Sequence, residues 1–236
     1  QDRLRLIDQS FDTAAAYAKA RAADPSLPSD RRWEAMRLVF GDSPTRRPVF
    51  VQANDVAQIR WALGLAERHG LRLVLVGGAD AWMMADVLKA RSVPVVVTAI
   101  HRLPLRRDDD VDAPFRLPAR LHEAGVSFCI ARGQPGSGAS STNERNLPFE
   151  AATAAAHGLP REEALKSVTL YPARILGVED QIGSLQPGRL ASFLVTDGDP
   201  LETTTRIERV FIEGREVDTA NRQSRLADRY RARLAP

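Results

Sequence analysis

Residues 182–195, IGSLQPGRLASFLV, follow residues 170–177, LYPARILG, near the end of the chain. Together the two segments predict a short helix, a tight turn at Pro187-Gly188, and then a strand. The strand is predicted because small and apolar residues alternate in it, and alternation is typical of a strand with one buried face. This order of elements guides the interpretation of the residues that precede it.

Upstream of these segments, short apolar runs alternate with helical patterns. The helical pattern is clearest at Val56, Ile59 and Leu63. Strand and helix alternate about every 25 to 30 residues, which predicts parallel strands joined by right-handed βαβ crossovers. The four runs predicted to be buried strands are residues 48–51, 71–76, 94–99 and 126–131.

The predicted fold class is α/β, with about four βα units, or half of a (β/α)8 TIM barrel, plus part of a small β-sandwich domain. Four parallel strands cannot close a barrel, because closure takes about eight. We therefore expect the other half to come from a missing segment or a partner chain. The predicted organisation is a helical lead-in at 1–47, a barrel half at 48–180, sandwich strands at 181–220, and a C-terminal helix at 221–236.

The composition narrows the classes of partner. No apolar run approaches the roughly 18 residues that span a bilayer, so we expect no membrane partner. The formal charge is +3, and the basic residues form no stripe with interleaved aromatic residues, so we expect no nucleic acid. Arg106 and Arg107 precede three aspartates, which predicts a solvated loop. The single cysteine, Cys129, excludes an internal disulfide and lies in an apolar run that favours a buried thiol.

Two further segments carry a resemblance to a known family. Residues 145–151, RNLPFEA, and the turn at 198–201, GDPL, join the pattern of residues 170–195. Over about residues 48–217 the chain resembles the amidohydrolase superfamily, in its imidazolonepropionase-like and prolidase-like branch. The resemblance implies that the barrel half is the C-terminal one and that the strands after Gly183 belong to the β-sandwich. It also implies a hydrolase that acts on C–N bonds of non-peptide substrates or small peptides.

The same resemblance implies where metal ligands should lie. Family members hold one or two divalent ions, usually zinc, with histidines on strands one, five and six and an aspartate on strand eight. The metal-bound water then becomes the nucleophile. In this chain Gln52 stands at the strand-five position, Gly77 at the strand-six position, and residues 132–135, RGQP, at the strand-eight position. No His-x-His pair occurs, so we expect no metal ligands here unless a missing N-terminal half supplies them.

Polar residues at the predicted strand ends are candidate substrate-binding groups, because a barrel collects its functional groups at the carboxyl ends of its strands. Each also has a structural interpretation, such as helix capping for Asn54 and Asp80 or a loop position for His101. Arg132 could bind an anionic group. No catalytic residue is assigned. The candidates are Gln52, Asn54, Asp80, His101, Arg132 and Gln134.

Two functions follow from these observations, and the sequence leaves both open. The first is an amidohydrolase-type enzyme that acts on a small molecule. The second is a metal-free, non-catalytic amidohydrolase-like subunit that binds a ligand or completes a barrel. In either case we expect an oligomer or a partner chain. The sequence decides neither the substrate nor the compartment: a cytoplasmic protein is the default, and a periplasmic one requires that a signal was removed.

Overall fold

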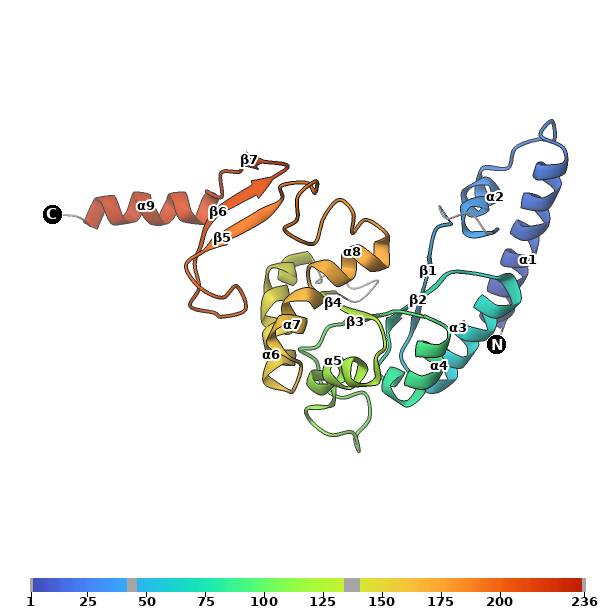
Figure 1. Cartoon of the computed structure of the whole chain (residues 1–236), viewed down its shortest axis with the longest axis horizontal. Helices are drawn as coiled ribbons and strands as arrows, with labels where there is room; N and C mark the ends of the chain where they lie inside the picture. Colours follow the sequence, from blue (N-terminus) through green and yellow to red (C-terminus); the bar gives the residue numbers. More distant parts are fainter. Residues whose placement is uncertain (1, 42–45, 134–140, 235–236) are drawn as a thin grey trace.

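The computed structural model describes residues 2–41, 46–133 and 141–234, and Figure 1 shows their arrangement. The elements occur in the predicted alternation of strands and helices. They are α1 (Asp2–Ala23), α2 (Arg31–Met36), η1 (Arg37–Val39), β1 (Val49–Ala53), α3 (Val56–His69), β2 (Leu73–Gly77), η2 (Ala81–Met84), α4 (Ala85–Ala90), β3 (Val95–Thr98), α5 (Ala113–Ala124), β4 (Phe128–Ala131), η3 (Ser141–Asn146), α6 (Leu147–Ala156), α7 (Arg161–Ser167), α8 (Leu170–Leu176), β5 (Phe193–Thr196), β6 (Ile207–Ile212), β7 (Arg215–Glu216) and α9 (Arg222–Leu234).

The four strands β1 to β4 form one parallel sheet in the order β1-β2-β3-β4. The prediction that these segments lie side by side is confirmed. Helix α3 illustrates why the crossovers form here: the Asp55 side chain accepts a hydrogen bond from the Gln58 amide at 2.8 Å, and Gly70 ends the helix in the left-handed conformation. The α/β class is therefore established, with β1 and β4 as the two edges of the sheet.

One face of the parallel sheet is covered by helices and the other is covered in part, which explains why most residues of its strands are apolar. On one face, side chains such as Leu75, Val97 and Ile130 pack against α3 to α6 in the main core. On the other face, Val74 and Cys129 pack against Ile175 of α8. Helix α8 therefore covers part of the face opposite the other helices.

After the Pro- and Asp-rich loop, the sequence predicts only a short helix over residues 119–123, and α5 is longer than this prediction. It spans Ala113–Ala124, begins with Pro114 in its first turn, and contains Pro118 in its interior. The longer helix forms because it has an apolar face: Leu117 and Leu121 are buried at helical spacing against the core. Gly125 ends it in the left-handed conformation.

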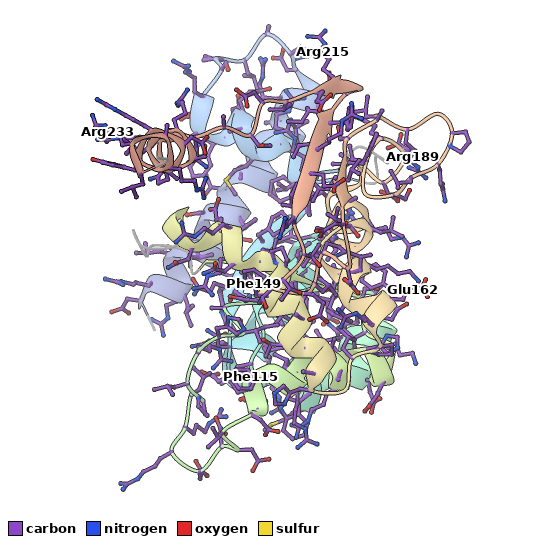
Figure 2. All side chains as sticks on the ribbon, turned by 90° about the vertical axis from the view of Figure 1, so that its left-hand side faces the viewer. Phe115, Phe149, Glu162, Arg189, Arg215 and Arg233 are labelled. Atoms are coloured by element: carbon purple, nitrogen blue, oxygen red, sulfur yellow. The ribbon has the colours of Figure 1, made fainter. Side chains whose placement is uncertain are left out.

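The chain ends in a second sheet, in which β5, β6 and β7 are antiparallel. Phe193 and Phe211 pair across β5 and β6 with ring centroids 4.7 Å apart. Helix α9 has no buried residue. Figure 1 places α9 and α1 at opposite ends of the molecule, and in Figure 2 the labelled Arg233 of α9 and Arg215 of β7 lie at its periphery. None of the helices in the described ranges is long and apolar enough to cross a bilayer.

The lead-in helix α1 packs beside α3. Asp8 accepts a hydrogen bond from Arg68 at 2.8 Å and lies 3.1 Å from the His69 ring nitrogen. Phe11 packs on the same imidazole with ring centroids 5.5 Å apart. His69 therefore joins two helices.

Candidate functional site

The four parallel strands end on the same side of the sheet, and this side is called the carboxyl edge, or simply this edge, below. Five of the six candidate residues lie there. Gln52 is exposed near the end of β1, and the others follow the strands in turn. Because parallel strands end at the same edge, each strand contributes at least one polar group to it. Gln134 lies outside the described residues. The five are Gln52 and Asn54 from β1 and its end, Asp80 after β2, His101 after β3, and Arg132 after β4.

Asp80 is a buried carboxylate that joins three of these loops. Its relative exposure is 3%, and both of its oxygens accept hydrogen bonds from the Arg106 guanidinium, at 2.9 and 2.5 Å. One oxygen also accepts from the amide of Val56, the first residue of α3, at 3.2 Å. The hydrogen bonds from Arg106 hold the pKa of Asp80 below its ordinary value, although burial raises it in part.

These contacts correct two expectations. Asp80 does not cap its own helix, because its side chain makes no capping bond to η2. Its side chain instead accepts a hydrogen bond from the backbone amide of Val56, the first residue of α3. The first amides of an α-helix have no acceptor within the helix, so they need a partner of this kind. Arg106 lies in a loop but is not merely solvated, because it reaches back to the buried carboxylate.

Asn54 and Gly77 pack against each other at the ends of β1 and β2. Gly77 has φ +95°, and a Cβ added to it would lie 2.3 Å from Asn54 Oδ1. The Asn54 carbonyl accepts from the Asp80 amide at 2.8 Å, and the Asn54 amide donates to Gln58 Oε1 at 2.8 Å. Asn54 therefore has a structural role at this edge, while Asp55 caps the helix. Gln52 is more exposed than Asn54 and is better placed to meet a ligand.

Arg132, directly after β4, forms an ion pair with Glu150 of α6. The Glu150 side chain is 0% exposed, and its second oxygen accepts from the Ile100 amide at 2.9 Å. Glu150 thus joins the end of β4 to Ile100, the second residue after β3. A buried carboxylate of this kind requires a paired charge and further hydrogen bonds, and both are present.

His101 also reaches α6. Its Nε2 lies 2.7 Å from Thr153 Oγ1, and its ring lies edge-on to Phe115 with centroids 6.5 Å apart. Glu150 and Thr153 are three residues apart, so they lie on the same face of α6. This face therefore holds the segments that follow β3 and β4. Four of the candidates thus form two clusters, Asn54 with Asp80 and His101 with Arg132 on α6.

The described residues of this edge do not by themselves fit a metal ion. The two buried carboxylates, Asp80 and Glu150, are engaged by guanidinium groups, which compete with a cation for the same oxygens. At Gly77 the Asn54 side chain fills the space that a larger side chain would need. Among the described residues, no group of three or more His, Cys, Asp or Glu side chains is arranged to hold a metal.

The sequence pattern of the amidohydrolase family matches residues 55–217, which is more than half of the chain. The chain belongs to this family. Over 72 residues it is 38% identical to the amidohydrolase tasK of Hapsidospora irregularis, a match that covers 30% of this chain and 7% of that protein. The superfamily expected from the motifs is therefore confirmed.

Solved structures agree with this assignment. The crystal structure of an amidohydrolase from Thermotoga maritima MSB8 matches 91% of this chain and 55% of its own, with 28% identity and a TM-score of 0.78. A prolidase complexed with N-methylphosphonate-L-proline matches 72% of this chain and 44% of its own, with 24% identity and a TM-score of 0.53, and so supports the fold alone. The chain spans about half the length of these structural relatives.

Proposed function

We propose that this chain forms the C-terminal half of the barrel in a hydrolase that cleaves C–N bonds of small peptides or non-peptide amides. In this proposal the described half binds the substrate rather than the metal. The observation that carries it is the convergence of polar side chains from all four strands on one edge, in a chain of the amidohydrolase family. In barrel enzymes this edge is where substrates bind.

The charges at the edge favour a neutral amide as the substrate. Both buried carboxylates are neutralised by arginine, at Asp80 and Glu150. Gln52 adds an exposed amide that offers both a donor and an acceptor, which matches the two polar groups of an amide bond. We assign Gln52 the leading binding role.

The two outer strands of the sheet, β1 and β4, support a partner that completes the barrel. Strand β1 pairs only with β2 among the described strands, and its Phe50 is 47% exposed. A groove of about 620 Å³ lies beside β1, and α1 contributes Leu4, Ile7 and Phe11 to its lining. We propose that the other four barrel strands dock here and at β4, whether they belong to a longer form of this polypeptide or to another chain.

The alternative is a non-catalytic subunit that binds a ligand or completes the barrel of an active partner. Two observations favour this alternative. Arginines pair with both buried carboxylates, and the Asn54 side chain fills the space beside Gly77. Both functions use the same edge of the sheet. They differ in whether the assembled protein holds a metal and turns over a substrate.

Metal analysis and a hydrolysis panel distinguish the two functions. The purified protein, alone and with any co-purifying partner, is assayed for bound divalent metal and for hydrolysis of dipeptides, hydantoins and imidazolones. The hydrolase is supported by stoichiometric metal with turnover that falls at least tenfold in Gln52→Leu. The matched control, Gln9→Leu on the exposed side of α1, should retain full activity. Metal-free protein that binds an amide without hydrolysing it supports the subunit instead.

A further inference from the structure

The turn after β3 holds the backbone of His101 in place at the carboxyl edge. Ala99, the first residue after β3, has φ +51°, a left-handed conformation that is unfavourable for a residue with a Cβ. The Ile100 amide donates to the buried Glu150 carboxylate at 2.9 Å, and the Arg102 amide donates to the Ile100 carbonyl at 2.8 Å. A strained turn that is bonded on both sides of one polar residue points to a functional role for that residue.

The side chain of His101 is held by Thr153 of α6. Its Nε2 lies 2.7 Å from Thr153 Oγ1, and the Thr153 hydroxyl donates to the Phe149 carbonyl at 2.9 Å. A hydroxyl has one hydrogen, so both contacts are hydrogen bonds only if Nε2 carries the imidazole proton and donates it to Thr153. The geometry therefore selects one tautomer of neutral His101, in which Nδ1 is the unprotonated nitrogen.

The unprotonated Nδ1 remains available to a ligand. His101 is exposed, and no hydrogen bond joins its Nδ1 to another of the residues that the structure describes. This nitrogen can only accept in the neutral imidazole, so its partner must be an N–H or O–H donor. The Phe115 ring lies edge-on to the imidazole, with centroids 6.5 Å apart, and adds an apolar wall beside it.

The neighbouring charges favour a neutral donor over an ammonium group. An ammonium group that leaves water needs an unpaired carboxylate. Here the Glu150 carboxylate pairs with Arg132, and Asp112 lies 3.9 Å from the Arg116 guanidinium. An amide N–H is a neutral donor and needs no counterion, so it suits this acceptor better.

We propose that His101 accepts, at Nδ1, a hydrogen bond from an N–H group of the substrate, and that Thr153 positions the imidazole for this contact. The inference rests on the proposed function, because it adds an acceptor to the edge at which Gln52 lies. It narrows the substrate class to amides and cyclic amides that keep at least one N–H. A compound without an N–H leaves the acceptor without a partner and should bind more weakly.

Nitrogen NMR of the isotopically labelled protein, with any co-purifying partner, tests the tautomer. The chain has four histidines, so the imidazole signals of His101 can be assigned by correlation with its backbone. At pH 8, where an ordinary imidazole is neutral, His101 should be protonated at Nε2. Thr153→Val removes the hydroxyl and should give a mixture of tautomers, whereas Thr153→Ser should restore the Nε2–H form. A wild-type His101 that is protonated at Nδ1 would overturn the proposal.

Titration with hydantoin and with 1,3-dimethylhydantoin tests the acceptor role, because only hydantoin has N–H donors. Hydantoin should shift the Nδ1 resonance of His101 saturably in the wild-type protein, and dimethylhydantoin should not. By calorimetry, the Kd of hydantoin should rise roughly fivefold in His101→Phe, which corresponds to the loss of one hydrogen bond. His122→Phe is the matched control and should leave the Kd unchanged, because His122 lies in the last turn of α5, away from this edge.

Three results would overturn the proposal: equal shifts with both compounds, no saturable Nδ1 shift, or an unchanged Kd in His101→Phe. The wild-type titration gives its answer even if His101→Phe fails to fold. Neither metal nor turnover is measured, so these outcomes are separate from those of the metal analysis and the hydrolysis panel.

Discussion

Replacing Arg132 by methionine should destabilise the fold strongly, because it leaves the Glu150 carboxylate buried without its partner. Methionine keeps much of the aliphatic packing of arginine, so the change isolates the charge. Breaking a buried pair typically costs about 3–5 kcal/mol, and the 19% exposure of Arg132 places the expected loss at the lower end, ~3 kcal/mol. For a chain of this size that corresponds to a drop in Tm of roughly 6–12 °C.

The companion variant Glu150→Gln separates the charge from the shape. Glutamine retains an oxygen for the Ile100 amide, so it keeps that hydrogen bond. The double variant Arg132→Met/Glu150→Gln removes the uncompensated charge and should be more stable than Arg132→Met by about 1–2 kcal/mol. Urea denaturation of all three variants at pH 7 measures these differences.

An exposed ion pair provides the control for this series. Arg231 and Asp228 lie 2.9 Å apart on α9 with side chains 77% and 73% exposed, so Arg231→Met should leave the urea midpoint unchanged. The reasoning fails if Arg132→Met loses less than ~1 kcal/mol, the low end of the penalty for a buried unpaired group. It also fails if the double variant is less stable than Arg132→Met.

Three further predictions follow from single residues. Because Arg106 holds the pKa of Asp80 below its ordinary value, ionised Asp80 stabilises the fold above about pH 4, and this contribution is lost as the pH falls further. The urea midpoint of the wild-type protein should therefore fall more steeply below pH 4 than that of Arg106→Gln. Parallel curves for the two proteins would contradict this. Gly77→Ala should cost about 2 kcal/mol or more in urea denaturation from its positive φ and close contact, whereas Gly64→Ala inside α3 should be neutral or stabilising. Burial raises the pKa of Cys129 to about 12, so the native thiol should resist a disulfide reagent at pH 8 and react in urea; rapid labelling of native protein would refute its burial.

The strands and most helices could be predicted because their signals are local. Each β-strand of the parallel sheet is a short, largely apolar run, and α3 is flanked directly by its capping Asp55 and its terminating Gly70. A pattern of period 2 or 3.6 is sufficient to identify such elements. Helix α5 was underestimated because Pro114 and Pro118 indicate a helix break, whereas its buried face at Leu117 and Leu121 favours the longer helix.

The partners of the site residues could not be predicted, because they come from distant segments. Arg106 and Asp80 are 26 residues apart, and Glu150 meets the Ile100 amide across 50 residues. No periodicity relates such positions. Glu150 did have one signal: it is the only charged residue in LPFEAATAAA, and an isolated carboxylate on an apolar helix is rarely buried without a partner. The identity of that partner required the structure.

Two arginines, Arg106 and Arg132, hold the loops at this edge in place. In a parallel sheet the βα loops follow the carboxyl ends of the strands and must be held in place there. A cation shared between carboxylates is one way to hold them. Here Arg106 joins its loop to Asp80 and the start of α3, while Arg132 joins β4 to Glu150 and, through it, to Ile100. Each guanidinium thus connects segments that belong to different βα units. A positively charged side chain cannot leave the site on dialysis, so the geometry of this edge should persist in chelator, and that persistence is compatible with either proposed function.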